Sequence, residues 1–254
     1  MARMILKAAN TFLNLIVIIA LCTASLYAGY ALWDNNQVYA AAENVQDSMI
    51  KLKPVVAEGE EGASFEELLA VNPDVCAWVS VDNTNIDFPI LQGETNLTYI
   101  NRDVYGNFAL AGSIFLDSRN DRQFHDLVSL LYGHHMEGSD MFGDLDKFKD
   151  GAFFDENRTG QLILPDRVYD LEIFACMLVE ASEDAIFDPH LYEADIDKLL
   201  SLTELEAMHY DAEKVADLRA HSGDSQILLL STCSTEFTDA RTIVLAEMKP
   251  HSNR

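Results

Sequence analysis

A continuous apolar segment near the N-terminus dominates the hydrophobic pattern of the chain. Residues 12–33 carry no charged side chain, and a helix needs only about 20 such residues to cross a bilayer. Arg3 and Lys7 precede this segment and Asp34 follows it. The positive-inside rule therefore predicts a cytoplasmic N-terminus at 1–11, a transmembrane anchor at 12–33 and an extracellular remainder. A cleaved signal peptide is the alternative, but its apolar region is usually only about 7 to 15 residues long.

The segment that follows the anchor has a weaker apolar pattern. Over 36–53 the apolar residues recur every three or four positions, which predicts an amphipathic helix that ends at Pro54. An acidic stretch at 55–63 has the composition of a flexible linker. We therefore expect 34–63 to be a helical spacer and acidic linker that carries a folded domain away from the bilayer.

Short strand patterns begin after residue 64. Ser64 and Glu67 have capping-box spacing for a short helix that ends at Asn72. In Val75–Val81 the apolar residues alternate with period two, which predicts a half-buried strand. Further strand candidates lie at 86–91, 113–116, 127–132, 161–164, 168–179, 226–231 and 242–248.

Eight short strands with turn signals between most of them favour a mainly β fold. The pattern is typical of an antiparallel barrel or sandwich rather than of alternating parallel units. One long interruption, 194–220, has apolar residues on an approximately helical face and predicts a helical insertion before the last two strands. We expect 64–254 to form one extracellular domain in which helices are added to the β core.

The charge of the chain excludes one class of partner. It has 42 acidic and 17 basic residues, and without Arg3 and Lys7 the exported part carries 15 basic residues and a net charge of -27. Such a surface repels a polyanion, because phosphate contacts need clustered basic residues. We expect no nucleic-acid partner.

Four cysteines occur, and one of them lies inside the apolar segment. The other three, Cys76, Cys176 and Cys233, cannot all pair in one exported chain, so at least one thiol is free unless it bonds to another chain. Cys76 and Cys176 lie within predicted strands and are expected to be core residues. The cysteines lack metal-ligand spacing, and the acidic residues and histidines between Asp117 and Asp140 match no known metal-binding loop. We expect no metal and no cofactor.

The last two predicted strands bring chemically active residues toward each other. Cys233 ends one apolar strand and Arg241 begins the next, so they lie at the same end of the sheet if these strands pair across their connecting loop. His134 and His135 follow Gly133 at the end of an earlier strand, where glycine allows a sharp turn. A thiol, an imidazole and a cation are sufficient for acyl transfer through a thioester.

The same residues also have non-catalytic interpretations. Cys233 could be an inert buried thiol, the commonest state of a free cysteine. The two histidines could be solvated turn residues, and Arg241 could form a surface ion pair with Glu236 or Asp239. Composition and spacing alone leave these alternatives open.

Several motifs resemble those of a known family, the sortases. The stretch LLSTCSTEFTDARTIVLAEM at 229–248 resembles the TLxTC signature and downstream arginine of sortases, although Leu229 stands where Thr is common. The stretch LLYGHHM resembles their strand-end histidine. The helical insertion and the stretch NLTYINRDVYGNFALAGSIFLDSRND are similar to class B sortases in particular. The resemblance covers about residues 64 to 248, and its motifs occur in family order.

The resemblance implies an eight-stranded β-barrel and a membrane-bound cysteine transpeptidase of Gram-positive bacteria. Such enzymes cleave a sorting motif near the C-terminus of a secreted protein, usually between Thr and Gly, and hold the acyl group as a thioester that an amine resolves. By motif, Cys233 is the nucleophile and His134 rather than His135 is the acid/base. Arg241 would position the substrate or stabilise the oxyanion.

The resemblance also implies binding residues and partners. Ser231 and Thr232 precede Cys233 on its strand and are expected to line the substrate groove. The partners would be a secreted surface protein or pilin that bears the motif, and an amine of a peptidoglycan precursor or of a pilin lysine. Two other functions stay open. An extracellular cysteine peptidase would release the acyl group to water, and a non-catalytic surface-binding barrel would keep Cys233 buried.

Overall fold

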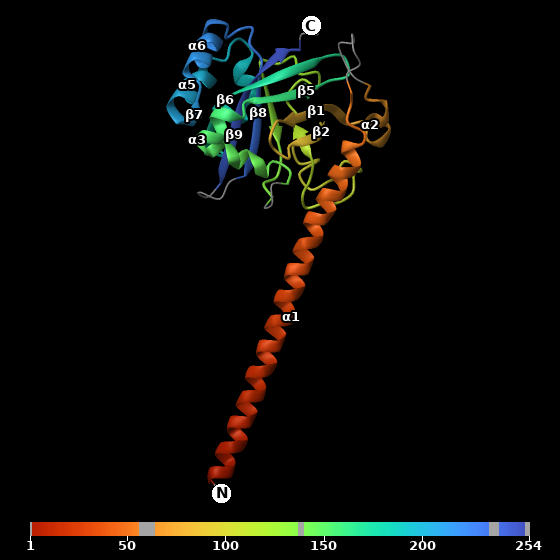
Figure 1. Cartoon of the computed structure of the whole chain (residues 1–254), viewed down its shortest axis with the longest axis vertical. Helices are drawn as coiled ribbons and strands as arrows, with labels where there is room; N and C mark the ends of the chain where they lie inside the picture. The colour runs from red at the N-terminus through yellow and green to blue at the C-terminus, as the bar shows by residue number, and fades with distance from the viewer. Residues whose placement is uncertain (1, 56–63, 137–139, 234–238, 252–254) are drawn as a thin grey trace. The chain divides into compact units, whose positions relative to one another are not determined.

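The computed structural model describes residues 2–55, 64–136, 140–233 and 239–251, and at Cys233 it describes the backbone. The chain divides into two compact units, Met1–Ala41 and Ala42–Arg254. The first contains most of helix α1 (Ala2–Ile50), and the second contains the strands and the other helices (Figure 1). All but the first residue of the linker predicted at 55–63 lies outside the described residues.

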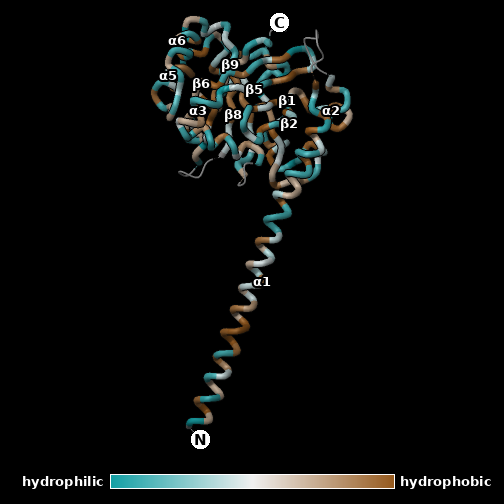
Figure 2. Tube along the Cα trace, viewed as in Figure 1, coloured by the Kyte–Doolittle hydropathy of each residue, from teal (hydrophilic) through white to brown (hydrophobic). Residues whose placement is uncertain are grey.

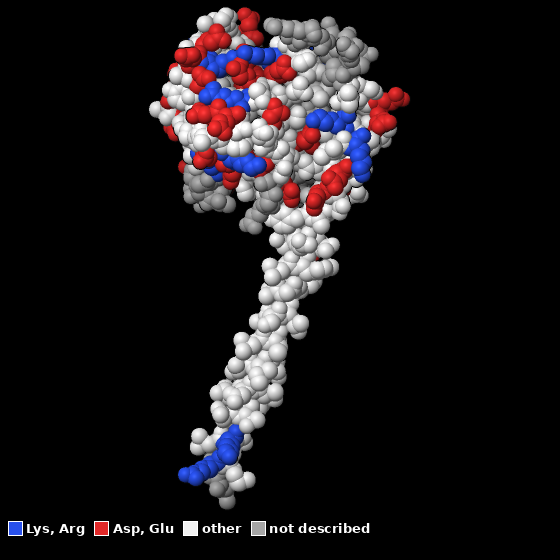
Figure 3. All heavy atoms as spheres, in the orientation of Figure 1, with Lys and Arg blue, Asp and Glu red and all other residues white. Residues whose placement is uncertain are grey.

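Helix α1 contains both helical segments that were predicted before residue 54. It runs without a break from Ala2 to Ile50, because no proline lies between the apolar and the amphipathic segments. In the part of the chain that the structure describes, α1 is the one helix long and apolar enough to cross a membrane, and Figure 2 shows its apolar stretch in brown. None of its most apolar 18 residues is buried. Figure 3 shows basic side chains near its start, followed by a stretch without charged side chains on the face in view.

Eight of the described strands form a closed barrel in the second unit. They are β1 (Val75–Val81), β2 (Asp87–Leu91), β3 (Ile114–Leu116), β4 (Val128–Tyr132), β5 (Thr159–Ile163), β6 (Val168–Glu180), β8 (Ile227–Cys233) and β9 (Ala240–Pro250). The strand order is β5-β1-β2-β3-β4-β8-β9-β6, and β5 pairs with β6 to close the barrel. The mainly β fold and all eight predicted strands are confirmed, with ends that differ by a few residues.

The prediction of an antiparallel barrel or sandwich is wrong for two pairs of strands. β2 pairs with β3 in parallel, and β4 pairs with β8 in parallel. A parallel pair needs a connection that returns the chain to the starting end of the first strand. The chain supplies residues 92–113 for one pair and 133–226 for the other. The hydrophobic pattern of one strand does not indicate whether the strand beside it runs parallel or antiparallel to it.

The insertion predicted as one helix at 194–220 contains two helices and a short strand. α5 (Asp197–Glu206) is followed by β7 (Ala207–Tyr210), which pairs with β6, and then by α6 (Ala212–Ala220). Asp211 separates the last two elements, because its side chain accepts a hydrogen bond from Lys214 N and caps a new helix. Two short helices, α4 (Asp184–Phe187) and η2 (Pro189–Tyr192), precede α5.

The remaining helices are α2 (Glu66–Val71), η1 (Gly143–Lys149) and α3 (Gly151–Glu156). The capping box predicted for α2 does not form. The N-cap residue is Phe65, and its side chain forms no capping hydrogen bond. Ser64 Oγ accepts only a long hydrogen bond of 3.5 Å, from Glu66 N. In Figure 1, α2 lies on the opposite side of the barrel from α5 and α6.

Two clusters of buried side chains hold the barrel. One cluster joins the barrel to the insertion and includes Leu229 of β8 and Leu200 of α5. The other includes Trp78 of β1, Leu68 of α2 and Met49 from the last turn of α1. β8 is therefore held by its two neighbouring strands and by the insertion, so that its C-terminal end is a rigid place for a reactive residue.

Leu229→Ala is expected to lower the free energy of unfolding by about 3 kcal/mol, because it leaves a cavity between β8 and the insertion. Leu229 is 0% exposed, whereas Leu205 of α5 is 77% exposed. Leu205→Ala is thus a matched control, with an expected change within about 0.5 kcal/mol. Denaturant unfolding followed by tryptophan fluorescence measures both. Equal losses in the two variants would contradict the packing of the insertion on β8.

Candidate active site

The C-terminal ends of β4 and β8 lie side by side. The two strands pair in parallel with Tyr132 beside Ser231, and Gly133 N donates a hydrogen bond of 3.1 Å to Ser231 O. His134 and Cys233 each follow this aligned pair by two residues. The backbones of the candidate base and the candidate nucleophile are therefore at the same end of neighbouring strands.

The start of β9 completes this end of the sheet. β8 and β9 pair in antiparallel register with Cys233 opposite Arg241 and Thr232 opposite Thr242. The pairing predicted across the connecting loop is thus observed. Directly opposite residues of antiparallel strands have Cα atoms only about 4.5 to 5.5 Å apart. The residue directly opposite Cys233 on the neighbouring strand is therefore Arg241, whose side chain ends in a guanidinium.

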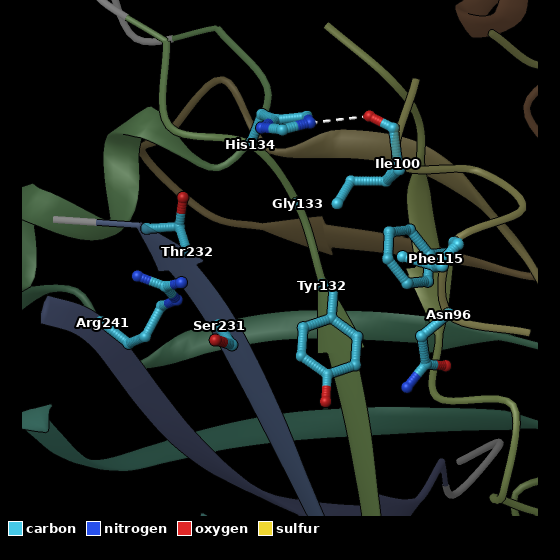
Figure 4. Close-up of a pocket in the computed structure, with 10 residues that line it drawn as sticks. Asn96, Ile100, Phe115, Tyr132, Gly133, His134, Ser231, Thr232 and Arg241 are labelled. Carbon is cyan, nitrogen blue, oxygen red and sulfur yellow. Dashed lines mark hydrogen bonds between the residues drawn. The ribbon is translucent and has the colours of Figure 1, made fainter. Parts of the chain in front are cut away.

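A pocket of about 280 Å³ opens at this end of the strands. Its lining combines apolar and polar side chains: Asn96, Leu97, Ile100, Phe115, Tyr132, Gly133, His134, Ser231, Thr232 and Arg241. Figure 4 shows Ser231, Thr232 and Arg241 along one side of this space and Phe115 and Asn96 along the other, with His134 at one end. The sequence analysis named four of these residues as site candidates, and the structure brings all four to one pocket.

The hydroxyl groups of Ser231 and Thr232 are unusual for buried polar groups. Both residues are only 2% exposed. Among the described residues neither hydroxyl oxygen has a hydrogen-bond partner. A buried hydroxyl without a partner is costly, so groups of this kind are expected to bond to something else. Both residues line the pocket, where a bound molecule could supply the partner.

The ring of His134 is oriented by the backbone of the β2–β3 connection. Its Nε2 lies 2.7 Å from the carbonyl oxygen of Ile100 (Figure 4). A carbonyl only accepts, so Nε2 keeps its proton and Nδ1 is the atom that can gain and lose one. This contact assigns the acid/base role of the ring, if it has one, to Nδ1.

Two glycines allow this arrangement by leaving room for close neighbours. Gly112 has a φ of +61°, and a Cβ there would lie 2.5 Å from Ile100 O and 3.1 Å from the His134 ring. Gly133 was expected to allow a sharp turn, but it is not among the residues with positive φ. Its role is packing, because a Cβ would lie 2.5 Å from Ile114 and 2.7 Å from Phe142.

His135 has a different partner from His134. Its Nε2 lies 2.9 Å from Asp146, whose other oxygen accepts hydrogen bonds from Thr242 and pairs with Lys149. Burial opposes ionisation of Asp146, but the bond and charge of Lys149 and the His135 contact outweigh it and lower the pKa of this carboxyl. His135 is not among the residues that line the pocket.

Arg241 is partly buried and faces the pocket. Its Nη1 donates a hydrogen bond of 2.9 Å to the carbonyl of Ala240. Within the described ranges no carboxylate forms an ion pair with it, and Asp239, one of the two candidate partners, is exposed. Glu236, the other candidate, lies outside the described residues. The guanidinium is thus positioned to meet a bound molecule rather than Asp239.

Comparisons with known proteins agree with this geometry. Residues 79–249 match the Sortase domain family. The chain belongs to the sortase family. It is 32% identical over 180 residues to sortase B of Listeria monocytogenes, an alignment that covers 70% of each chain. Sortases are cysteine transpeptidases, so this sortase is an enzyme of that type, and its eight-stranded barrel is the fold that the sequence motifs implied.

Two solved structures show the same class. A Streptococcus pyogenes class B sortase involved in pilus biogenesis is 36% identical, with a TM-score of 0.66, and the match covers 73% of this chain and 98% of the other. A Staphylococcus aureus sortase B–substrate complex is 26% identical, with a TM-score of 0.70, and covers 85% and 98%. This chain is similar to class B sortases in sequence and in fold.

The two other cysteines of the barrel domain, Cys76 and Cys176, are buried, as expected. Cys76 and Cys176 are free thiols in β1 and β6. Burial raises the pKa of each thiol to about 12. Neither thiol is reactive at neutral pH, because the thiolate is the nucleophilic form.

The acidic residues and histidines considered as a metal site have separate partners in this sortase. Asp117 pairs with Arg119, Asp121 contacts His125, and His135 contacts Asp146. Over the described ranges no cluster of three or more such groups could hold a metal ion.

Half of the pocket lining was missed by the sequence analysis. Asn96, Leu97, Ile100, Phe115 and Tyr132 line the pocket. Asn96 and Leu97 were noticed only as part of the stretch that resembles class B sortases. Ile100 contributes a backbone carbonyl, which no side-chain motif can indicate.

Proposed function

We propose that this sortase cleaves a C-terminal sorting motif of secreted proteins through a thioester on Cys233 and transfers the acyl group to an amine. The observation that carries the proposal is the meeting of three strand ends at one pocket. There the backbone of Cys233 lies opposite that of Arg241 and beside the strand that ends before His134.

The proposed reaction has two steps. His134 Nδ1 takes the thiol proton, and the sulfur of Cys233 attacks the peptide carbonyl, so that a C–S bond forms. The imidazolium then donates this proton to the leaving amine as the C–N bond breaks. Arg241 stabilises the oxyanion of the tetrahedral intermediate. In the second step the incoming amine attacks the thioester and His134 accepts its proton. A new C–N bond forms as the C–S bond breaks, and the imidazolium returns the proton to the sulfur of Cys233.

Ser231 and Thr232 are proposed as substrate-binding residues. Their buried hydroxyls are without a partner among the described residues, and both line the pocket. A peptide backbone carries donors and acceptors at regular spacing, which suits two hydroxyls on one strand. Binding of the motif would therefore remove the cost of leaving these groups unpaired.

The proposed acceptor is an amine of a peptidoglycan precursor or of a pilin lysine. The similarity to a class B sortase involved in pilus biogenesis supports the second alternative as a candidate. The proposed topology places the N-terminus in the cytoplasm, a membrane span at 12–33 and the catalytic domain 64–254 outside. The basic residues Arg3 and Lys7 before the span and Asp34 after it support this orientation.

The test uses the full chain in detergent and a library of peptides that carry sorting-type motifs. Mass spectrometry with and without added amines should detect a thioester adduct on Cys233 and its conversion to a new amide. The adduct identifies the motif, and the preferred amine identifies the acceptor class. Adducts that only hydrolyse with every amine would favour the peptidase alternative. A folded protein that forms no adduct with any peptide would refute the proposal.

Cys233 is also expected to react selectively with a small electrophile. With iodoacetamide at pH 8, alkylation of Cys233 should exceed that of Cys76 and Cys176 by at least about 100-fold. The two buried thiols have pKa values of about 12, so only about one molecule in 10,000 carries either thiolate. Peptide mapping by mass spectrometry measures all three rates in one sample. Equal rates would indicate that Cys233 is an inert core thiol.

A further inference from the structure

Asp117, which follows β3, has a buried carboxylate next to the pocket that accepts several hydrogen bonds. Its side chain is 0% exposed. Oδ1 accepts hydrogen bonds of 2.9 Å from both the backbone N and the Nε of Arg119. Oδ2 accepts from Arg119 Nη2 at 2.8 Å, from Asn96 Nδ2 at 2.9 Å and from the Tyr132 hydroxyl at 3.0 Å. Asp117 does not line the pocket, but two of its three partners do.

The contact with Asp117 fixes the side-chain amide of Asn96. Nδ2 donates to Asp117, and Oδ1 accepts a hydrogen bond of 2.7 Å from Ser118 N. These two bonds determine which end of the amide is nitrogen. Nδ2 has a second hydrogen, and Asn96 lines the pocket (Figure 4). Asn96 can therefore offer a donor to a carbonyl or amide oxygen of a bound peptide.

Asp117 also connects the pocket to the end of helix α4 through Arg119. Arg119 Nη2 donates to the carbonyl of Phe187 at 2.5 Å, and Nη1 lies 3.5 Å from Asp188. The ring of Phe187 stacks on Tyr132 at 6.4 Å between centroids and 12° between planes. Asp117 thus fixes the hydroxyl of Tyr132, and Phe187 packs against its ring. Phe187 is itself bound to Arg119 through its backbone carbonyl.

The charge of Asp117 is maintained by these contacts. Burial opposes its ionisation, but the hydrogen bonds from Arg119 and Asn96 and the charge of Arg119 outweigh burial and lower the pKa of the carboxyl. Burial and the nearby charge of Asp117 raise the pKa of Tyr132, so the phenol keeps its proton and donates it. The carboxylate is therefore an acceptor for all three neighbours at once.

We propose that Asp117 is a positioning residue for peptide recognition in this sortase. It contacts no substrate, but it orients the Asn96 amide and the Tyr132 ring so that the pocket presents a donor to an oxygen of the bound peptide. The inference rests on the proposed function, because it assumes that the pocket binds the peptide. It predicts an effect on peptide binding that leaves the reactivity of Cys233 unchanged.

The test measures kcat and KM of the full chain in detergent with a fluorogenic peptide that carries the best motif from the library. Asp117→Asn is expected to raise KM about tenfold and to change kcat by less than about threefold, the effect of misdirecting one hydrogen bond in the bound complex. The rate of Cys233 alkylation by iodoacetamide should stay within about twofold. In an Asn96→Ala background, Asp117→Asn should raise KM by less than about threefold, because its effect passes largely through Asn96.

Asp144→Asn is the matched control. Asp144 is another buried carboxylate, 1% exposed, but its partners are Asn85 and Lys147, which do not line the pocket. An equal rise in KM in this variant, or a full tenfold effect of Asp117→Asn in the Asn96→Ala background, would overturn the proposal. If Asp117→Asn gives no cooperative unfolding transition, Arg119→Lys replaces it in the same comparison, since lysine cannot bind both oxygens of Asp117 as a fork.

Failure of this inference differs from failure of the proposed function. If Cys233→Ala retained turnover, the thioester mechanism would be wrong whatever the result at Asp117. If Cys233→Ala abolished turnover while Asp117→Asn left KM unchanged, the mechanism would stand and the positioning role would be refuted. A loss of Cys233 alkylation in Asp117→Asn would show a general disturbance of the site and would also refute the positioning role.

Discussion

His134→Ala should lower kcat/KM for the sorting peptide by about 1,000-fold or more, since it removes the group that takes and returns the proton. His135→Ala is the matched control, because the neighbouring ring contacts Asp146 and does not line the pocket. We expect its kcat/KM to change by less than about fivefold. The measurement is the initial rate of thioester formation by mass spectrometry. The reverse order of the two effects would assign the acid/base role to His135.

Alkylation separates the chemical role of His134 from a structural one. His134→Ala should also slow the reaction of Cys233 with iodoacetamide at pH 7, because the thiol loses the neighbouring group that takes its proton. The thermal unfolding temperature should change little, since the ring is only partly buried. A large drop in unfolding temperature would instead indicate that the contact with Ile100 supports the fold.

Arg241→Ala should lower kcat by about 100- to 1,000-fold with a small change in KM, as expected for loss of one oxyanion donor. Within the described residues the guanidinium has no carboxylate partner, so its removal leaves no buried charge unpaired there. Arg241→Lys tests geometry against charge. Lysine keeps the charge without the planar fork, so it should recover only part of the activity. Unchanged turnover by folded Arg241→Ala would remove this residue from the site.

The strands could be predicted from the sequence because the barrel core imposes local patterns. Val75–Val81 was predicted as a strand from its period of two, although the expectation that it is half-buried is wrong, because six of its seven residues are buried. The other strands are short apolar runs bounded by turns. β7 was missed because four residues between two helices carry too little pattern, and its apolar residues extend the helical face of 194–220. The parallel pairings were missed because a strand's own residues do not determine which strand lies beside it or in which direction.

The candidate site also has a part that the sequence could predict and a part that it could not. Cys233 and Arg241 could be placed together because their strands are consecutive and pair as neighbours. The position of His134 beside them depends on the β4–β8 pairing, which the sequence did not predict. Only the family resemblance grouped His134 with Cys233. The contributions of Ile100 and Gly112 come from backbone geometry in a long connection, where neither periodicity nor side-chain type carries a signal.

The parallel pairing of β4 with β8 also determines when the site can form during synthesis. Tyr132 and its partner Ser231 are 99 positions apart in the sequence. Pairs so distant form late, because the entropy of closing the loop is lost before their contacts compensate for it. The strand that ends before His134 is synthesised before the helical insertion, and the strand that ends in Cys233 is synthesised after it. The C-terminal ends of β4 and β8 can therefore meet only after residues 133–226 have been synthesised.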